Sequence, residues 1–596
     1  MNTYDPNAQQ AADVRTGLLE RTVSMMESGR LLDAETCLRP LLSAVPLDSE
    51  AWGTWGLILV RSGRRHEGVE KLKAAFDAAP EQQVTLDHLA AALRTAGQLE
   101  AASSLYTHAL TECPASPVIL TSLGAVAMQA NRPRKAVAWF RRAVKAKPDD
   151  PTSLSNLGAA LNACELYAKA ELFLSRAVAL KPNFPEALLN LGAALHGQGK
   201  FAAAIDAYTW AQRFGGRPED VAFNLATAHE HLGDVSGALK YLDRVIEVNP
   251  SHAEAHRNKG FLLLMSGDYA RGWAEYAWRW RCRDHACQKR PYKHPPWLGV
   301  QKGQRLLVWG EQGIGDEILY ASLIPELVRS GVDLTLEVDA RLVDLIRRSM
   351  PSVNVIARTP LPDRRLIDEE FDAQVSIANL GEHLRPDSSR FVVHPCPYLR
   401  PEQQKMALFR RRFKSAAAGP VIALSWASLN PRIGGQKSLK LSELRELFEL
   451  PGLQWIDVQY GDTSAERQAL ADELGPSLVH LSDVDPFNDL DSLAAVLAAC
   501  DLVITASNVV AHLAASMGLQ TWILVPASSG KLWYWGQGCD RSIWYPSATL
   551  FRQTERGSWR EPLALIKEQL VRIIGASETS FGSDPHGAAP KAMPSR

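Results

Sequence analysis

The feature that most constrains the fold is a period of 34 residues through the first half of the chain. It is marked by Pro46, Pro80, Pro114, Pro148, Pro182 and Pro250, with Gly216 at the one position where the proline is replaced. Between the prolines, apolar and small residues keep one register, which in one unit is Leu154, Leu157, Gly158, Leu161, Ala170, Leu174 and Ala177. Units of this length cannot bury an apolar face alone, so the period predicts a stack of helix pairs.

This pattern resembles the tetratricopeptide repeat. Small residues such as Gly158 and Ala170 let two helices approach, large ones fill the gap, and a proline ends the second helix. We expect a disordered N-terminus over residues 1–14, then seven repeats over residues 15–252. A partial eighth repeat and a connecting segment occupy residues 253–295, and Trp273–Arg281 is predicted to form a capping helix that docks on the next domain.

Asparagine recurs just before the Leu–Gly position of four successive units, as Asn156, Asn190, Asn224 and Asn258. An amide both donates and accepts hydrogen bonds, which suits a peptide backbone of any sequence. The same ladder occurs in the tetratricopeptide domain of the O-GlcNAc transferase, which this half resembles, and the resemblance implies that these residues bind peptide. The alternative is that asparagine is a tolerated polar residue beside the core.

Composition limits the class of protein. The chain has 596 residues and a net charge of −1, so no overall basic field indicates nucleic acid or anionic lipid. Neither a secretory signal nor a membrane-length apolar run is visible, and eight scattered cysteines favour reduced thiols, so we expect a cytoplasmic protein without membrane insertion. The spacing of Cys282, Cys287, His285 and His294 fits no standard zinc pattern.

From Pro295 onward, short apolar runs alternate with helical segments, which predicts two lobes built on parallel sheets. The first lobe is placed at residues 296–415 and the second at 416–574, with Phe409–Gly419 as the linker between them. The last helix, Glu561–Ile574, is predicted to cross back to the first lobe, and residues 575–596 to be disordered. Strands are expected at Leu306–Trp309, Leu334–Val338, Val353–Ile356, Ala373–Ser376, Val421–Ser425, Gln454–Gln459, Leu502–Thr505 and Thr521–Val525.

The stretch Leu306–Leu323 combines a strand, a glycine-rich turn and a helix. Glycines at Gly313 and Gly315 would allow backbone amides to approach a ligand, and Asp316 falls near the start of the helix, where open α/β sheets bind ligands. A dinucleotide site is the alternative, because Glu337 and Asp339 stand near the position of a ribose-binding carboxylate.

Two further motifs indicate a phosphate site. Lys437 lies in a glycine-containing loop after a strand, where a lysine can contact the phosphate of a leaving nucleotide, although a solvated loop is the alternative. Ser507 and Asn508 end another strand and can cap the helix that carries His512, so free amides at its N-terminus would favour an anion. A lone histidine in a helix is otherwise structural.

These motifs resemble the heptosyltransferase-like group of GT-B glycosyltransferases. In that group a G-x-G-D turn supplies a general base, which Asp316 matches, and a D-T-G-x-x-H-L-A turn holds donor phosphates, which His512–Ala514 match. Ser507–Asn508–Val509 departs from Asp-Thr-Gly and suggests a different nucleotide sugar. Together with the repeats and the Trp544–Gln553 segment, the motifs resemble bacterial glycosyltransferases that modify flagellin, in which the sugar can be pseudaminic acid carried by CMP.

The resemblance implies a metal-independent protein O-glycosyltransferase without a cofactor, in which the repeats bind the acceptor, flagellin. Asp316 would take the proton of a Ser or Thr hydroxyl, and Lys437, His512 and the amides after Ser507 would stabilise the leaving phosphate. Asp483 and Asp485 form a D-x-D that we interpret as a solvated turn. The alternatives are a repeat scaffold with a degenerate GT-B domain and a glycosyltransferase that acts on lipid or polysaccharide.

Overall fold

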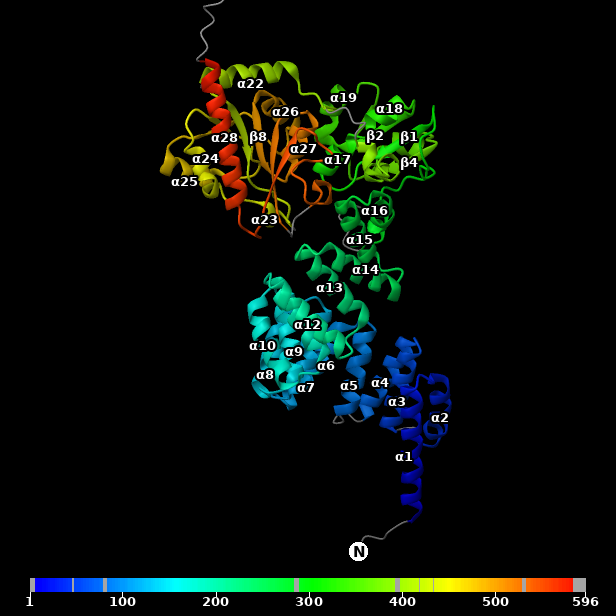
Figure 1. Ribbon diagram of the computed structural model, residues 1–596. Helices are drawn as coiled ribbons and strands as arrows, with labels where there is room; N and C mark the ends of the chain where they lie inside the picture. Colours follow the sequence, from blue (N-terminus) through cyan, green and yellow to red (C-terminus); the bar gives the residue numbers. More distant parts are fainter. Residues whose placement is uncertain are drawn as a thin grey trace, which may run out of the picture. The chain divides into compact units, whose positions relative to one another are not determined.

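The computed structural model describes residues 6–45, 48–78, 83–282, 289–391, 397–416, 419–431, 433–527 and 532–581. The chain divides into two compact units, Met1–Ala228 and His229–Arg596. The first consists of helices, and the second continues with helices before two parallel β-sheets (Figure 1).

The helices up to α16 come in pairs that keep the period of the sequence, since α3, α5, α7, α9 and α11 begin at Ser49, Gln83, Pro117, Pro151 and Pro185. The pairs of the first unit are α1 (Pro6–Glu27) with α2 (Leu31–Ala44), α3 (Ser49–Arg61) with α4 (Arg65–Ala78), α5 (Gln83–Thr95) with α6 (Leu99–Glu112), α7 (Pro117–Gln129) with α8 (Pro133–Ala146), α9 (Pro151–Ala163) with α10 (Tyr167–Leu180), and α11 (Pro185–Gly197) with α12 (Phe201–Arg213). The units meet within α13 (Pro218–His231), and α14 (Val235–Val248), α15 (Ala253–Ser266) and α16 (Tyr269–Tyr276) follow.

A glycine against a large side chain sets the helix spacing inside a repeat. A Cβ at Gly158 would lie 2.3 Å from Leu174 Cγ, and a Cβ at Gly192 would lie 2.3 Å from Tyr208 Cε1. Because real Cβ contacts do not become this short, any larger residue would push the two helices apart. The small and large positions of the sequence pattern thus pack as predicted.

The N-terminus differs from the expectation. Helix α1 begins at Pro6, inside the stretch 1–14 that the sequence predicts to be disordered, because its apolar side packs on α2 through residues such as Leu19 and Met26. Two of the periodic prolines, Pro46 and Pro80, lie outside the described residues.

The first sheet has the strand order β3-β2-β1-β4, and every neighbouring pair is parallel. Its strands are β1 (Arg305–Trp309), β2 (Asp333–Asp339), β3 (Asn354–Arg358) and β4 (Ala373–Ser376). The associated helices are α17 (Ile314–Ala321), α18 (Ile324–Arg329), α19 (Val343–Ser349), α20 (Arg365–Asp368) and α21 (Leu380–Leu384), with short 3-10 helices η2 (Ala340–Leu342), η3 (Ile377–Asn379) and η4 (Ser388–Phe391).

The second sheet is also parallel, in the order β10-β9-β8-β5-β6-β7. Its strands are β5 (Val421–Ser425), β6 (Gln454–Asp457), β7 (Leu478–His480), β8 (Leu502–Ala506), β9 (Thr521–Val525) and β10 (Ala548–Arg552). The helices are α22 (Gln403–Ala416), α23 (Gly434–Lys437), α24 (Arg445–Phe448), α25 (Ser464–Leu474), α26 (Leu490–Ala499), α27 (Val509–Ser516) and α28 (Arg560–Phe581), with η5 (Leu441–Leu444) and η6 (Trp533–Trp535).

Helices cover both faces of the second sheet, as expected for a parallel sheet. Along β5, Val421 and Ala423 belong to the core that contains α26 and α27, whereas Ile422 and Leu424 belong to the core that contains α25 and α28. Successive side chains of a strand point to opposite faces, which explains this alternation. The arrangement brings α17 of the first sheet against α27 of the second.

Three sequence predictions about these lobes need correction. The segment predicted as the linker, Phe409–Gly419, lies largely in helix α22, whose Phe409 and Phe413 are buried in the core with α26. The last helix does not cross back to the first lobe, because its Ile566 and Leu570 pack in the core of the second sheet. It also continues to Phe581, past the predicted start of the disordered tail at residue 575, and residues 582–596 lie outside the described part.

Strands β7 and β10 were not predicted. The β7 strand is only Leu478–His480 and is largely exposed, so it carries no apolar run. The β10 strand follows a loop rich in aromatic residues and pairs with β9 at the sheet edge, in a segment where the sequence shows no helix–strand alternation.

The end of the repeat array docks directly on the first sheet, as the sequence predicts for Trp273–Arg281. Trp273 of α16 donates a hydrogen bond of 2.8 Å to the backbone oxygen of Arg385, and a Cβ at Gly381 would lie 2.3 Å from its ring. Beyond it, η1 (Ala277–Arg281) carries Arg279, which is 1% exposed and pairs with the buried Glu311 at the end of β1.

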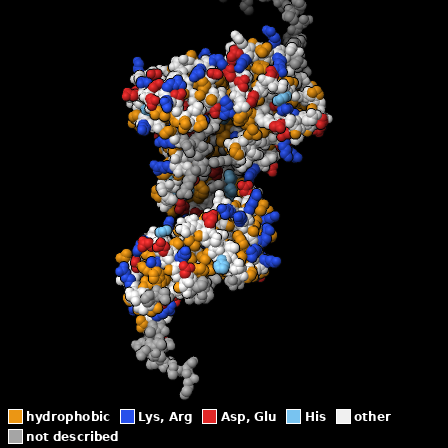
Figure 2. All heavy atoms as spheres, turned by 180° about the vertical axis from the view of Figure 1, so that it is seen from behind, with side chains coloured by type: hydrophobic (Ala, Val, Ile, Leu, Met, Phe, Trp, Pro, Cys, Tyr) orange, Lys and Arg blue, Asp and Glu red, His pale blue; other side chains and the backbone are white. Residues whose placement is uncertain are grey.

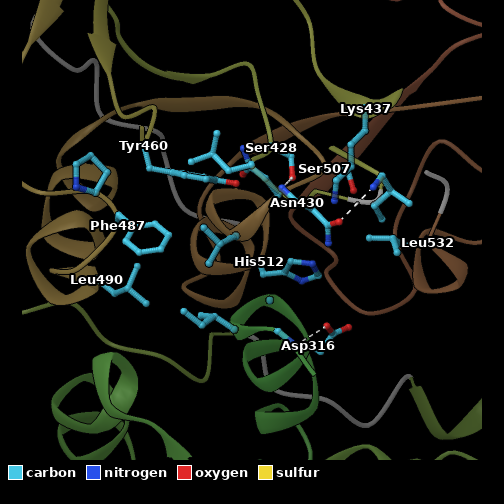
Figure 3. A pocket seen from close by; sticks show the side chains of 18 of the residues that line it. Asp316, Ser428, Asn430, Lys437, Tyr460, Phe487, Leu490, Ser507, His512 and Leu532 are labelled. Atoms are coloured by element: carbon cyan, nitrogen blue, oxygen red, sulfur yellow. Dashed lines mark hydrogen bonds between the residues drawn. The ribbon is translucent and has the colours of Figure 1, made fainter. Parts of the chain in front are cut away.

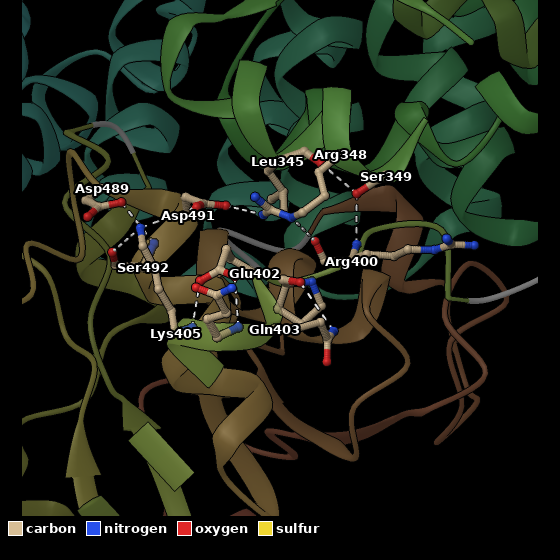
Figure 4. A network of polar contacts seen from close by, with 12 residues as sticks. Leu345, Arg348, Ser349, Arg400, Glu402, Gln403, Lys405, Asp489, Asp491 and Ser492 are labelled. Atoms are coloured by element: carbon tan, nitrogen blue, oxygen red, sulfur yellow. Dashed lines mark hydrogen bonds and ion pairs between the residues drawn. The ribbon is translucent and has the colours of Figure 1, made fainter. Parts of the chain in front are cut away.

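A polar network joins the two lobes (Figure 4). Arg348 of α19 pairs with Asp491 at the start of α26, and its Nε donates a 3.0 Å hydrogen bond to the backbone oxygen of Arg400. Lys405 of α22 adds a 3.1 Å hydrogen bond to Ser492. These contacts fix α19, α22 and α26 relative to one another.

The buried Arg279–Glu311 pair provides a stability test. Replacing one partner leaves an uncompensated buried charge, so Arg279→Met should lower the free energy of unfolding by about 3–5 kcal/mol. The double variant Arg279→Met/Glu311→Leu should lose less than Arg279→Met, since neither charge remains. Denaturant unfolding followed by tryptophan fluorescence measures the difference.

The matched control is the Arg305–Glu369 pair, 3.6 Å apart with both side chains 46% exposed. Breaking it with Glu369→Gln should change the free energy of unfolding by less than about 1 kcal/mol. Equal effects of Arg279→Met and Glu369→Gln would contradict a special role of the buried pair.

Candidate functional site

A pocket of about 360 Å³ lies where α17 of the first sheet faces the carboxyl ends of the second sheet. Open α/β sheets bind ligands at this edge. In Figure 3, Tyr460, Phe487 and Leu490 lie toward one end, and Asp316, Lys437 and Leu532 lie toward the other. The pocket brings together Gly313, Gly315, Asp316, Lys437, Ser507, Asn508 and His512, all of which the sequence predicts as site residues.

The turn between β1 and α17 is held by contacts with the end of the repeat array. Glu311 accepts two hydrogen bonds from Arg279, of 3.0 and 2.6 Å. Burial acts to raise the pKa of Glu311, but the charge and hydrogen bonds of Arg279, together with hydrogen bonds from Ser376 and Gln312, hold it below its usual value. The amide of Gln312 donates to Tyr276 Oη at 2.7 Å. Gln312 has a φ of 61°, a left-handed conformation that is uncommon outside glycine, so these contacts hold a strained turn.

Asp316 is the third residue of α17, and its carboxylate accepts a 3.2 Å hydrogen bond from the Gly313 N–H. This is half of a capping box, in which the carboxylate satisfies a free amide at the helix start. Burial raises the pKa of Asp316 to about 6, with the Glu311 charge acting in the same direction and Lys437 opposing it. A carboxylate with a pKa near neutrality can accept a proton during a reaction.

Lys437 is the last residue of α23 and only 5% exposed. Within the described part of the chain, its ammonium has no hydrogen-bond or ion-pair partner. Burial lowers the pKa of Lys437 to about 8, and the charge of Asp316 opposes this change. A buried ammonium without a partner is suited to an anionic ligand.

The sequence predicts that His512 stabilises a phosphate with Lys437, and both residues line the pocket. Its Nδ1 lies 3.0 Å from Tyr545 Oη and its Nε2 lies 3.2 Å from Tyr534 Oη. Burial lowers the pKa of His512 to about 3, and the Lys437 charge acts in the same direction. A neutral ring between two hydroxyls positions Tyr534, whose side chain also lines the pocket.

The glycine at position 315 is explained by helix packing, whereas the sequence predicts that it lets backbone amides approach a ligand. A Cβ at this position would lie 2.8 Å from His512 Cδ2, so glycine is what lets α17 approach α27. At Gly313 a Cβ would meet only Asp316 Oδ2, at 3.5 Å, which is an ordinary contact. Only Gly315 is therefore required by packing.

Ser507 and Asn508 line the pocket, but their side chains are engaged within the protein. Ser507 Oγ accepts a 2.7 Å hydrogen bond from Trp535 Nε1. Asn508 caps α27 through the N–H of Val510 and donates to Ser425 Oγ and to the backbone oxygen of Ala427. The predicted cap is confirmed, and the polar groups predicted to hold phosphate fix the loop after β5 instead.

Several residues that shape the pocket carry no signal in the sequence. Gln459 is buried, and its Oε1 accepts hydrogen bonds from Ser425 Oγ and the N–H groups of Trp426 and Ala427. Tyr534 lies in an aromatic segment that no motif distinguishes, and Tyr545 lies in the Trp544–Gln553 segment, to which the resemblance assigns no role in the site. Their roles depend on tertiary contacts with loops that are distant in sequence.

The other end of the pocket is aromatic. The rings of Tyr460 and Phe487 have centroids 6.2 Å apart, and the Arg341 guanidinium lies 4.9 Å from the Phe487 centroid. Apolar rings beside a polar end form a pocket that suits an amphipathic ligand with a flat ring and an anionic part.

None of the four asparagines lines this pocket, and each lies on the first helix of its repeat. All four are half-buried. The side chain of Asn224 donates to the backbone oxygen of Asp220 at 2.8 Å, and the backbone oxygen of Asn190 accepts a hydrogen bond from Asn162. Asn258 accepts weakly from Arg257 at 3.4 Å.

The D-x-D pair behaves as the solvated turn that we predicted. Asp483 pairs with Arg412, and Asp485 accepts from the N–H groups of Phe487 and Asn488. Within the described ranges, no group of three His, Cys, Asp or Glu side chains could hold a metal ion. Of the sequence cluster considered for zinc, Cys287 and His285 lie outside the described residues.

Among the helices of the described residues, none combines the length and the apolar character that crossing a bilayer requires.

Comparisons with known proteins identify the helical part. Residues 93–161 and residues 223–277 match families described as tetratricopeptide repeat. Solved structures similar to this chain include a tetratricopeptide repeat protein from Parabacteroides merdae. Its sequence is 14% identical, the match covers 42% of this chain and 99% of that chain, and the TM-score is 0.36. Another is pilF of Pseudomonas aeruginosa, which is 18% identical; the match covers 36% of this chain and 96% of that chain, with a TM-score of 0.31. The chain therefore contains tetratricopeptide repeats, which generally mediate protein–protein interactions.

A curated relative is similar over a longer stretch. Protein FlbA of Caulobacter vibrioides is 28% identical over 415 residues, which cover 60% of this chain and 68% of that protein. The matched share of this chain exceeds the repeat array predicted at residues 15–252, so the similarity extends beyond the repeats.

The contact between Gly315 and His512 can be tested by adding one methyl group. The His512 ring is held by two tyrosines and cannot move aside easily, so Gly315→Ala should lower the free energy of unfolding by about 1–3 kcal/mol. Gly313→Ala is the control and should change it by less than about 1 kcal/mol, because its Cβ finds an ordinary contact. Similar unfolding midpoints for the two variants would contradict the packing argument.

The pKa of Asp316 predicts a pH dependence of stability. A folded-state pKa raised to about 6 means that burial favours the protonated form. The contribution of protonated Asp316 to the free energy of unfolding is thus complete below the unfolded pKa near 4, and it is lost as the pH rises through 6. Asp316→Asn, which cannot ionise, should be more stable than the natural protein at pH 7, and this advantage should disappear near pH 4.

Denaturant midpoints of both proteins at pH values from 4 to 7 measure this difference. A stability difference that is independent of pH would show that Asp316 titrates normally.

Proposed function

We propose that this protein is a glycosyltransferase of the GT-B type that transfers a sugar from a nucleotide sugar to Ser or Thr of a protein. The observation that carries the proposal is the pairing of Asp316 and Lys437 in one pocket. Asp316 lies on a helix of the first sheet and Lys437 on a helix of the second. Burial raises the pKa of Asp316 to about 6 and lowers the pKa of Lys437 to about 8. A base and a cation with these values suit proton removal and phosphate departure at neutral pH.

In the proposed reaction, the acceptor hydroxyl oxygen bonds to the anomeric carbon of the sugar while the bond from that carbon to the phosphate oxygen breaks. The hydroxyl proton passes to the Asp316 carboxylate. The electron pair leaves with the phosphate, whose charge Lys437 stabilises. The amides at the start of α27 lie beside the same pocket and add to this stabilisation.

The aromatic end suits the base of the nucleotide. Tyr460 and Phe487 offer ring faces, and Arg341 lies against Phe487. Following the sequence resemblance, we propose a CMP-linked nonulosonic acid such as pseudaminic acid as the donor. The scheme uses neither a metal nor a further cofactor.

We propose that the repeats present the acceptor, and that the acceptor is flagellin, as the resemblance to flagellin glycosyltransferases implies. The similarity to Protein FlbA beyond the repeats supports a common role for the two halves. Asn156, Asn190, Asn224 and Asn258 would bind the acceptor backbone. This role places the protein in the cytoplasm, where flagellin is made before export.

A scaffold with an inactive second half is the competing proposal. It is favoured by one observation, namely that the side chains of Ser507 and Asn508 are used within the protein. The two proposals differ in whether Asp316 matters for glycosylation.

Flagellin from a deletion strain, measured by intact mass spectrometry, tests the proposal without knowledge of the donor. We expect a loss of mass that the natural protein restores and Asp316→Asn does not, since the variant keeps the fold but loses the base. If Asp316→Asn restores the full mass, the scaffold proposal is favoured. An unchanged flagellin mass in the deletion strain would exclude flagellin as the acceptor.

The mechanism is tested by the rate of sugar transfer in a mixture of the purified protein, CMP-pseudaminic acid and unmodified flagellin. The rate should rise as the pH passes about 6 and fall above about 8, as Asp316 and then Lys437 lose their protons. A rate that is flat from pH 5 to 9 would contradict the roles of these two groups.

A further inference from the structure

The second helix of the repeat at residues 117–150 has an unusual charge. From Arg132 to Lys147 the chain carries seven basic residues and no acidic one, although its net charge is −1. One side of α8 is buried through Ala136, Phe140 and Ala143. The basic side chains of Arg134, Lys135, Arg141, Arg142 and Lys145 are exposed, and Figure 2 shows Lys and Arg side chains gathered along one edge of the repeats.

These charges are largely uncompensated. Arg132 pairs with Glu100 at 3.4 Å and Lys147 with Asp150 at 3.6 Å. In the described ranges, the five basic residues between them have no carboxylate within 4.0 Å. A solvated helix face normally mixes both signs, so a one-sign face is a candidate for contact with a charged partner.

A groove of about 670 Å³ lies beside these charges, between α6 and α8 with α7 as its floor. Leu123 and Val126 form the apolar floor, and Lys135 and Trp139 stand on the α8 side. The Arg142 guanidinium lies 5.0 Å from the Trp139 ring centroid. Glu100 and Arg132, which pair with each other, also line the groove. The groove therefore combines an apolar floor, an aromatic wall and basic side chains on the α8 side.

The groove is open because of a small residue. Ser103 of α6 lines it, whereas Val69 of α4 and Val137 of α8 occupy the same position 34 residues before and after. Serine is smaller than valine, so Ser103 takes up less of this space than a valine at the same position would.

We propose that this groove binds an acidic segment of a partner protein that carries apolar side chains. An apolar side chain would rest on Leu123 and Val126 beside Trp139, and neighbouring Asp or Glu side chains would pair with Lys135 and Arg142. The groove shares no lining residue with the pocket at Asp316, and none of the four asparagines lines it, so it serves recruitment of a partner and is independent of the proposed transfer reaction.

A fluorescein-labelled peptide that alternates Asp or Glu with Phe or Leu, added to the full-length protein, tests the proposal by fluorescence anisotropy. Lys135→Glu/Arg142→Glu should weaken its binding by about tenfold or more, since two attractive pairs become repulsive. Ser103→Val should also weaken binding, and the fold should tolerate it because the neighbouring repeats carry valine there.

Lys73→Glu/Lys169→Glu is the matched control, with the same change in charge on exposed lysines of α4 and α10, and it should alter binding by less than about twofold. Asp316→Asn should bind the peptide normally, which separates this proposal from the proposed catalysis. Three results would overturn the inference: equal binding of a poly-Glu peptide without apolar residues, binding that Ser103→Val leaves unchanged, or tighter binding of single-stranded DNA that depends on Lys135.

Discussion

The buried ion pair between Arg279 and Glu311 is the interaction on which the arrangement of the second unit depends. Arg279 lies in η1 after the last repeat helix, and Glu311 lies in the turn after the first strand of the first sheet. Neither charge is stable in this position without the other. The pair therefore couples the last repeat to the turn that carries Asp316, and the left-handed Gln312 is held by Tyr276 of the same array. A repeat array that supports the turn in this way is part of the site's architecture, not a separate tether.

The second constraint is the contact of α17 with α27. Gly315 lets the helix starts of the two sheets approach until the His512 ring fills the space between them. His512 is then too buried to take a charge and orients Tyr534 instead. His512 thus packs between the two helices and positions Tyr534 in this structure, and the predicted contact of His512 with phosphate stays a prediction.

The sequence predicts the elements better than the contacts. The 34-residue period predicts the helix pairs because each repeat needs the same glycine-against-large packing, as Gly158 and Leu174 illustrate. The strand before Asp316 is predicted because its apolar run is buried on both faces. Strand β7 is too short and exposed to leave such a pattern. The neutrality of His512 and the internal bonds of Asn508 depend on Tyr534, Tyr545 and Ser425, which no local pattern connects to them.

The pocket shifts the pKa values of Asp316 and Lys437 together, because both side chains are buried in it. Burial disfavours both charges, and each charge partly restores the other, so their pKa values converge toward neutrality from opposite sides. An anion placed beside Lys437 would raise the pKa of that lysine and also that of Asp316, because both would then face a negative charge. The same ligand would therefore hold Lys437 protonated and make Asp316 a stronger base. Departure of the anion reverses both changes, so the affinity for an anionic ligand and the strength of the base are linked through one electrostatic environment.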